Sequence, residues 1–213
     1  MPVARPPGPG LYTPSGQRKY LSPSERHRFL DAAQSCARAE LRTLCLTLAH
    51  TGCRISEALA LTAGCIETES GFIAIRCLKK RSRAVIVREV PVPPDLLLEL
   101  SSVHDLTTCH RDHRLWSLSR SRAWHLVKTV MSAARIPAGP HSTPKGLRHG
   151  FGLHAIRSGV PLNLVQRWLG HARMETTAIY LQAIGNEERE IAARMWTATP
   201  HTSAATFHPP VHS

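Results

Sequence analysis

The sequence lacks any long apolar run. Its 213 residues contain no stretch of about 18 consecutive apolar residues, the length that a membrane-spanning helix needs. The segment from Met1 to Gly10 is rich in proline and has no apolar stretch of the kind found in secretion signals. We therefore expect a cytoplasmic protein that does not associate with membranes.

Metal-binding and disulfide patterns are also missing. None of the six cysteines belongs to a C-x-x-C pair, and most lie in apolar stretches, as small buried side chains do. The 13 histidines form no H-E-x-x-H or H-x-H arrangement. The sequence thus predicts neither a structural zinc site nor a disulfide framework, and we expect no metal and no cofactor.

Acidic residues are scarce relative to basic ones. The chain has 15 Asp and Glu residues against 27 Lys and Arg residues, which gives a net charge of +12. A domain this basic usually has a polyanionic partner, most often nucleic acid. The alternative is an arginine-rich protein from a GC-rich genome, in which the charge carries little functional information.

The chain length suits one domain with a substantial core. Residues 1–18 are rich in proline and glycine and predict a disordered arm. Residues 198–213 show no helix or strand pattern and predict a disordered tail. Residues 19–197 remain as the folded domain.

Within this domain the pattern predicts a mostly helical α+β fold with one small antiparallel sheet. Ser22, Pro23 and Glu25 have the order of a capping box with proline in the first turn, which begins a helix. Two alternating segments, 72–78 and 84–92, predict paired strands joined by a basic turn. Further helices are expected over residues 41–49, 121–134, 174–181 and 186–196, and after Ser56, Asp95, Thr143 and Pro161.

The stretch Thr51-Gly52-Cys53-Arg54-Ile55-Ser56-Glu57 places an arginine in apolar surroundings. A surface ion pair between Arg54 and Glu57 is the simplest interpretation, and such a pair contributes little. The flanking apolar residues favour another one, in which Glu57 holds Arg54 at the edge of the core and directs it toward a ligand.

The helix expected after Thr143 places Lys145 and Arg148 on one face, because residues three apart are neighbours. Two adjacent cations at a helix N-terminus favour an anion between them. The alternative is a solvated basic face. We expect His149, which precedes apolar residues, to be an inward-facing structural histidine, with a catalytic role as the alternative.

Two further side chains follow at fixed offsets. His171 comes directly after Gly170, the expected left-handed cap of a helix, and Tyr180 follows nine residues later. A tyrosine in a helix is more often a core residue than a nucleophile. Its occurrence with the basic residues favours a functional role, because arginines that neutralise phosphate oxygens and a phenol that attacks phosphorus transfer a phosphodiester without metal.

The densest run of charge joins the two expected strands, from Lys79 to Arg83. A solvated hairpin tip is one interpretation. The other is a basic finger, with Arg76 and Arg88 at its base, that contacts DNA phosphates. The DNA-binding residues expected in this finger are Lys80, Arg81 and Arg83.

From about Lys19 to Trp196, these motifs in this order resemble the catalytic domain of the tyrosine recombinase (phage integrase-like) family. In that family the arginines of the T-G-x-R-x-S-E stretch and the H-x-L-R-H box bind the scissile phosphate. The resemblance implies this role for Arg54 and Arg148. It also implies that His171, in the L-G-H turn, donates a hydrogen bond to the same phosphate.

The remaining roles follow from the same resemblance. The family's hairpin lysine protonates the leaving 5′ oxygen, and Lys79 matches it best, with Lys80 as the second choice. Tyr180 matches the tyrosine that forms a 3′-phosphotyrosyl bond. The resemblance implies a site-specific recombinase of a mobile genetic element. It would require neither metal nor ATP, associate with the nucleoid, and act as a homotetramer on paired sites in double-stranded DNA.

One position departs from the family. Lys145 stands where most members have the first histidine of the H-x-L-R-H box. It could carry the tyrosine proton, if Arg148 and Arg54 make its own proton easier to lose, or serve as a fixed phosphate contact. Both roles remain open at this point, and Lys145 is kept among the catalytic candidates.

A second departure is the missing N-terminal helical domain with which many members clamp DNA. The chain resembles short single-domain recombinases, such as those that invert fimbrial promoters, or a recombinase fragment. We therefore expect modest DNA affinity or a need for accessory DNA-binding proteins. The alternative functions are a non-catalytic DNA-binding regulator with the same fold and a type IB topoisomerase-like activity.

Overall fold

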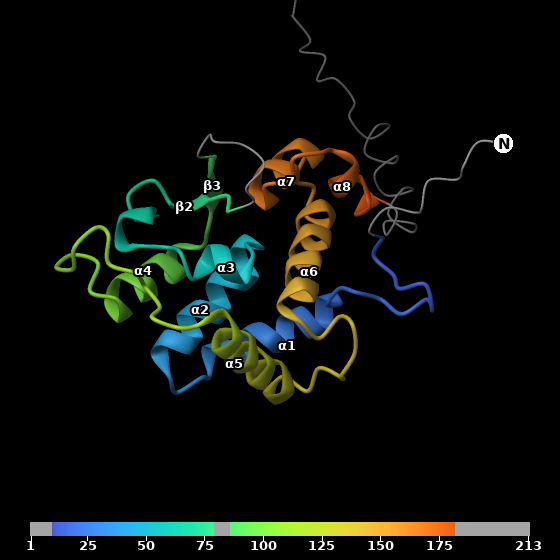
Figure 1. Ribbon diagram of the computed structural model, residues 1–213, viewed down its shortest axis with the longest axis horizontal. Helices are drawn as coiled ribbons and strands as arrows, with labels where there is room; N and C mark the ends of the chain where they lie inside the picture. Colours follow the sequence, from blue (N-terminus) through green and yellow to red (C-terminus); the bar gives the residue numbers. More distant parts are fainter. Residues whose placement is uncertain (1–9, 79–85, 182–213) are drawn as a thin grey trace, which may run out of the picture. The chain divides into compact units, whose positions relative to one another are not determined.

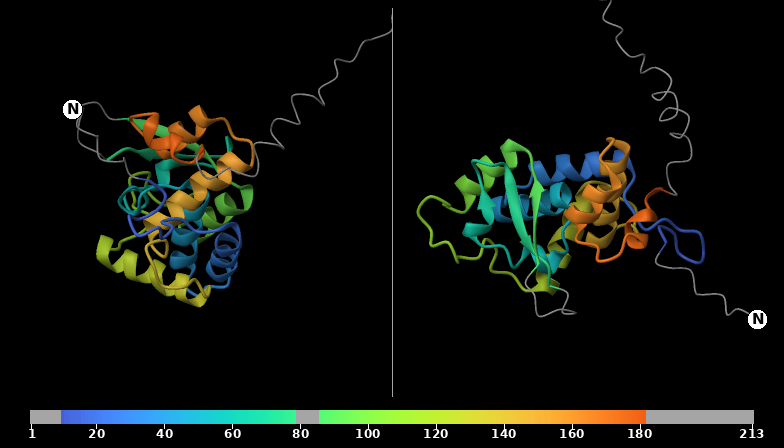
Figure 2. Two further views of the ribbon diagram at one scale, coloured as in Figure 1. Left: turned by 90° about the vertical axis from the view of Figure 1, so that its right-hand side faces the viewer. Right: turned by 90° about the horizontal axis from the view of Figure 1, so that it is seen from above.

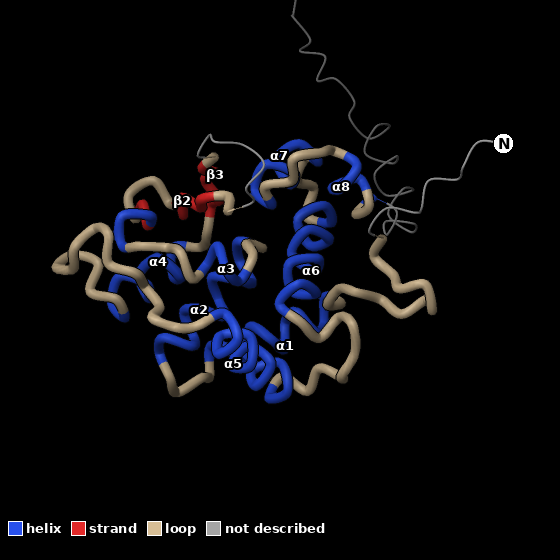
Figure 3. Tube along the Cα trace, in the orientation of Figure 1, coloured by secondary structure: helices blue, strands red, loops and turns tan. Residues whose placement is uncertain are grey.

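The computed structural model describes residues 10–78 and 86–181. Helices form about half of this part, together with one three-stranded antiparallel sheet (Figures 1 and 3), which confirms the predicted α+β class. The expected helix over residues 186–196 lies outside the described residues. The helices are α1 (Pro23–Gln34), α2 (Ala39–Thr51), α3 (Ile55–Ala58), η1 (Ala63–Cys65), α4 (Pro94–Val103), α5 (Arg120–Ala133), α6 (Pro144–Arg157), α7 (Leu162–Leu169) and α8 (Glu175–Ala178).

The core is built around α2. This helix packs against α1, α4, α5 and α6, so most of its side chains are buried. The helix α1 beside it begins with the predicted capping box, in which Ser22 Oγ accepts from the N–H of Glu25 and the Glu25 carboxylate accepts from the N–H of Ser22. Gly52 ends α2 with φ of 60°. The core thereby fixes the turn that leads to Arg54.

The sheet has the order β1-β2-β3, with β1 at Ile66–Glu67, β2 at Phe72–Arg76 and β3 at Val87–Pro91. The two predicted strands are confirmed, each shorter than expected. Side chains of β3 alternate, and Arg88 and Val90 point inward. Arg88 is only 4% exposed and lies opposite Ile75. The expectation that Arg88 belongs to a basic finger that contacts DNA phosphates is therefore wrong.

The C-terminal helices gather beside this sheet. Helix α7 packs against α6, α8 and β3, and Figures 1 and 2 show α7 next to β3. Segments that are more than 70 residues apart in the chain are thus neighbours, as the hydrogen bond from Arg88 to the carbonyl of Trp168 shows, with a sequence separation of 80. This packing brings the end of α7 close to α3.

The N-terminal segment differs from the expectation of a disordered arm up to residue 18. Leu11 is 3% exposed and packs in a cluster with Phe151 and Leu169. Tyr12 pairs with Arg18 across a turn that contains Gly16 at φ of 76°. The prediction is wrong for residues 10–18, because an apolar contact anchors this stretch despite its turn-forming composition. Residues 1–9 and the expected tail over 198–213 lie outside the described residues.

No helix within residues 10–78 and 86–181 is both long enough and apolar enough to cross a membrane.

Candidate functional site

Arg54 directly precedes α3 and is held by Glu57. The Arg54 N–H donates to Oε2 of Glu57 at 2.9 Å, and Nη1 donates to Oε1 at 2.6 Å. The predicted ion pair is confirmed. Glu57 is 1% exposed at its side chain whereas Arg54 retains 29%, so the carboxylate is the buried anchor and the guanidinium reaches the surface.

Arg88 is the second partner of Glu57, a role that the sequence pattern did not predict. Its Nη2 donates to Glu57 Oε2 at 2.7 Å, its Nε to the carbonyl of Trp168 at 2.6 Å, and its Nη1 to Cys77 Sγ at 3.1 Å. Burial raises the pKa of Glu57, but the charge and hydrogen bond of Arg88, with those of Arg54, lower it by more. Arg88 therefore ties the carboxylate that holds Arg54 to the last turn of α7.

Arg148 joins the ends of two helices. It lies within α6 at 7% exposure, where Nη1 donates to the carbonyl of Gly52 at 2.7 Å and Nη2 donates to that of Leu169 at 2.6 Å. Both acceptors are at helix C-termini, which favour a cation. Burial and the nearby Arg54 lower the pKa of Arg148 to about 10, so it stays protonated at neutral pH. Its donors cross-link the turn before Arg54 and the turn before His171.

His171 is presented by the cap of α7. Gly170 has φ of 63°, and the N–H of His171 donates to the carbonyl of Gln166 at 3.1 Å. The ring Nδ1 lies 2.9 Å from Thr177 Oγ1. Burial, followed by the charges of Arg148 and Arg54, lowers the pKa of His171 to about 3. The imidazole is therefore neutral at pH 7, with Nδ1 engaged and Nε2 left for another partner.

Tyr180 follows α8 and is fully buried, at 0% exposure. Its ring stacks on His171 with centroids 6.4 Å apart, and its oxygen lies 3.1 Å from Nδ1 of His149. The ring also fills the space above Gly152, where an added Cβ would come within 2.6 Å of Cζ. Burial raises the pKa of Tyr180 to about 12, although Arg148 and Arg54 oppose this shift. The phenol is thus neutral, and it lies within electrostatic reach of the two arginines.

Lys145 and His149 lie one turn apart on α6 but in different surroundings. Lys145 is exposed, whereas His149 is 8% exposed and faces inward as predicted. Burial and the charges of Lys145, Arg148 and Lys19 lower the pKa of His149 to about 4. The sequence did not predict its contact with the tyrosine oxygen, because no periodic pattern links His149 to Tyr180, 31 residues later.

The structure thus gathers most of the predicted catalytic residues into one site. Two kinds of contact connect these residues. Arg148 donates hydrogen bonds to two backbone carbonyls, those of Gly52 and Leu169, and the ring of Tyr180 stacks on that of His171. The guanidiniums of Arg54 and Arg148 repel each other, which an anion between them would relieve. The site suits a phosphate group. The residues brought together are Arg54, Arg148, His171 and Tyr180.

The hairpin turn lies outside the described residues, so the predictions for Lys79, Lys80, Arg81 and Arg83 stay predictions. Its base is described. The N–H of Cys77 donates to the carbonyl of Ile86 at 2.8 Å, and this contact continues the pairing of β2 with β3 beyond Arg76. Cys77 also lies against Arg88. The described base of the hairpin therefore lies beside the network that holds Arg54.

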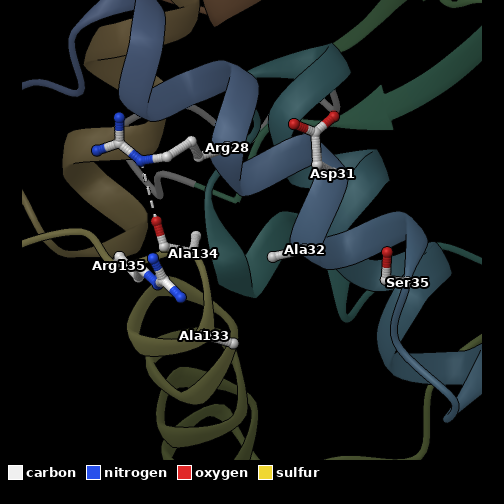
Figure 4. A pocket seen from close by; sticks show the side chains of 7 residues that line it. All are labelled: Arg28, Asp31, Ala32, Ser35, Ala133, Ala134 and Arg135. Atoms are coloured by element: carbon white, nitrogen blue, oxygen red, sulfur yellow. Dashed lines mark hydrogen bonds between the residues drawn. The ribbon is translucent and has the colours of Figure 1, made fainter.

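One surface pocket of the described part lies away from this site. A surface pocket of about 330 Å³ lies between α1 and the end of α5, where Arg28 Nε donates to the carbonyl of Ala134 (Figure 4). None of its lining residues is among the predicted catalytic residues. Within the described ranges, no three His, Cys, Asp or Glu side chains gather as metal ligands.

Comparison with known proteins agrees with this arrangement. A model of the phage integrase family matches residues 19–187. The chain is 30% identical over 161 residues to "Tyrosine recombinase XerA" of Pyrococcus furiosus, covering 72% of this chain and 54% of that protein. It is 33% identical over 139 residues to "Tyrosine recombinase XerD" of Neisseria meningitidis serogroup B, covering 61% and 46%. The chain spans about half the length of these relatives.

Solved structures share the fold. The crystal structure of XerA recombinase superimposes with a TM-score of 0.67 at 25% identity, covering 83% of this chain and 64% of that one. The catalytic domain of bacteriophage HP1 integrase gives a TM-score of 0.62 at 22% identity, and the match covers 82% of this chain and 93% of that one. The second comparison shows that the described fold matches that catalytic domain almost throughout.

Proposed function

The chain belongs to the phage integrase family, and we propose that it is a site-specific DNA recombinase that cleaves and rejoins DNA through a 3′-phosphotyrosyl intermediate. One observation carries this proposal. Arg148 donates to the carbonyls of Gly52 and Leu169, and it thereby joins the turns that present Arg54 and His171. A site assembled from segments this distant around two cations and a phenol fits transfer of a phosphodiester.

Arg54 and Arg148 bind the non-bridging oxygens of the scissile phosphate. Each guanidinium uses only part of its five N–H groups on protein acceptors, so donors remain for the substrate. His171 donates from Nε2 when its proton is there, because Nδ1 is engaged with Thr177. These donors neutralise the charge that grows on the oxygens in the transition state.

Tyr180 is the nucleophile. Its oxygen forms a bond to phosphorus while the bond from phosphorus to the 5′ oxygen breaks. The phosphodiester energy is kept in the phosphotyrosyl bond, so rejoining needs no ATP. Because the phenol is fully buried in the described conformation, it has to become accessible to the phosphate before it attacks. Lys145, exposed in the first turn of α6, serves as a phosphate contact.

Lys79 acts as the general acid for the leaving 5′ oxygen. Lys79→Ala should slow cleavage of an ordinary substrate by about 10²-fold. It should spare a substrate with a bridging 5′ sulfur, because sulfur leaves without a proton. Rates of adduct formation on the two substrates test this. If the sulfur substrate restores cleavage by Lys80→Ala instead, Lys80 is the general acid. If Lys79→Ala slows cleavage of both substrates equally, Lys79 is not the general acid.

The hairpin side chains Lys80, Arg81 and Arg83 contact DNA phosphates. Their joint replacement by Ala should weaken binding to all sequences and lower the slope of log affinity against log salt by roughly 3, at about 0.9 per lost contact. Fluorescence anisotropy over a range of salt concentrations measures the slope. An unchanged slope would show that the hairpin tip faces solvent in the complex.

Recombination joins two double-stranded sites, so we propose a homotetramer on paired sites, with accessory DNA-binding proteins strengthening a modest affinity. A nucleoid location and a mobile element as the source follow from the same function. Several solved structures that share this fold contain DNA, among them "Structure of the Tn1549 transposon Integrase (aa 82-397, Y379F) in complex with transposon right end DNA".

A pool of duplexes with a randomised central segment, each carrying a nick, tests the function without knowledge of the site. Cleavage next to the nick releases a short fragment and traps the enzyme on DNA as an SDS-resistant adduct. Sequencing the trapped DNA gives the preferred site. A mobility shift without adduct would indicate a DNA-binding regulator, and adducts without sequence preference would indicate a topoisomerase.

A further inference from the structure

The contact between His149 and Tyr180 is not used by the mechanism above. Nδ1 of His149 lies 3.1 Å from the tyrosine oxygen, and the two rings have centroids 6.0 Å apart. Both side chains are buried, at 8% and 0% exposure. Within hydrogen-bond reach, a histidine is the commonest side chain that takes up a proton from a reacting group. The contact therefore places a candidate base directly on the nucleophile.

We propose that His149, rather than Lys145, accepts the phenol proton of Tyr180 during cleavage, a role that rests on the proposed function. As the tyrosine oxygen bonds to phosphorus, its proton passes to Nδ1 of His149. The bond to the 5′ oxygen breaks, and that oxygen takes a proton from the general acid. In rejoining, the 5′ hydroxyl gives its proton back to the general acid as it attacks phosphorus, the tyrosine oxygen leaves, and His149 returns the proton to that oxygen. No further reactant is needed.

The surroundings of His149 keep it available as an acceptor. Lys145 and Arg148 on α6 and Lys19 from the N-terminal segment all oppose its protonation, and burial does so more strongly. Tyr180 and His171, on the other side, are neutral at pH 7. The ring is thus uncharged before substrate binds. A bound phosphate offsets the three cations and makes the ring a stronger base when the proton must be received.

The position of Lys145 supports the same division of roles. Lys145 is exposed, and a solvated ammonium has no lone pair with which to accept a proton. In this chain the residue that opens the motif is exposed, whereas the residue directly after Arg148 is a buried neutral imidazole within reach of the phenol. The proton acceptor therefore stands four positions after Lys145 on α6, one turn further along the same face.

His149→Asn tests the proposal, because the amide oxygen of Asn takes the place of Nδ1 as a hydrogen-bond acceptor but cannot carry a proton. Single-turnover adduct formation on the trapped and sequenced duplex should fall about 10²-fold at pH 7. The rate of the variant should then rise about tenfold per pH unit between about pH 7 and 9, as hydroxide removes the proton instead, while the wild-type rate stays nearly flat. His154→Asn, an exposed histidine of the same helix, is the matched control and should behave as wild type.

A second pair of measurements guards against a folding defect. His149→Ala should regain cleavage when imidazole is added. A fluorinated tyrosine at position 180, whose phenol loses its proton more easily, should speed His149→Asn more than wild type. Full cleavage by His149→Asn, or slow cleavage that is independent of pH and imidazole, would overturn the proposal and leave His149 as a packing residue. Absence of adduct with wild-type protein would instead overturn the proposed function itself, and this inference with it.

Discussion

Tyr180→Phe is expected to abolish the covalent adduct while leaving DNA affinity nearly unchanged. The substitution removes only the oxygen that bonds to phosphorus, and the ring still stacks on His171 and fills the space above Gly152. It also leaves His149 Nδ1 without its partner, a cost of about 1–3 kcal/mol in stability for a buried acceptor. SDS gels measure the covalent adduct, and fluorescence anisotropy measures the DNA affinity.

The chain offers a control for this substitution in Tyr12, which is 51% exposed. Tyr12 and Tyr20 are joined to each other through their hydroxyls at 2.9 Å, in the segment before α1. Tyr12→Phe should therefore form adduct at the wild-type rate. An SDS-resistant adduct with Tyr180→Phe would show that another side chain is the nucleophile.

Glu57→Gln is expected to destabilise the fold by about 3–5 kcal/mol, the usual cost of removing one partner of a buried ion pair. Arg88, at 3% side-chain exposure, would keep its charge without a carboxylate, and Arg54 would lose the group that holds it. This is a large part of the roughly 5–15 kcal/mol by which most domains are stable. The urea midpoint at unchanged m-value measures the effect.

Two further variants separate this pair from surface electrostatics. Glu40→Gln removes a carboxylate that is 59% exposed at its side chain and pairs with Arg38, and it should change stability by no more than about 0.5 kcal/mol. The double variant Glu57→Gln with Arg88→Met removes both buried charges and should recover part of the loss. Equal effects of Glu57→Gln and Glu40→Gln would contradict the buried network.

The same carboxylate predicts a pH dependence. The pKa of Glu57 is lower in the folded protein than its ordinary value of 4.5, so its contribution is fully present above that value and is lost as pH falls through the folded pKa. Acidification below about pH 4.5 should therefore destabilise wild type more steeply than Glu57→Gln. Glu25, whose pKa is lowered to about 2 chiefly by its hydrogen bond to Arg18, contributes equally in both proteins.

Local patterns allowed much of the fold and site to be predicted. The capping box of α1 and the glycine cap of α7 involve residues within four positions of each other, and both were confirmed. The pair of Arg54 and Glu57 spans three residues and was predicted for the same reason. Such features depend on backbone geometry over one helical turn, which the sequence determines directly.

The missed features depend on contacts between distant segments. Arg88 was assigned to a DNA-contacting basic finger because of its charge, although its alternation with Val90 on β3 placed it on the inward face. The partner that stabilises it there, Glu57, is 31 residues away. His149 and Tyr180 are also 31 residues apart, and no periodic pattern links them. The N-terminal stretch around Leu11 was missed because one buried side chain outweighs a turn-rich composition.

The most direct test of the central claim is to identify the protein atom that becomes linked to DNA. Wild-type protein is incubated with the nicked duplex pool in the presence of EDTA, the adduct is digested with nuclease and protease, and the peptide that carries nucleotide mass is sequenced by mass spectrometry. The account predicts a single modified peptide, with the nucleotide joined through its 3′ phosphate to Tyr180. Modification of any other residue, or failure to form adduct unless a metal ion is present, would contradict it.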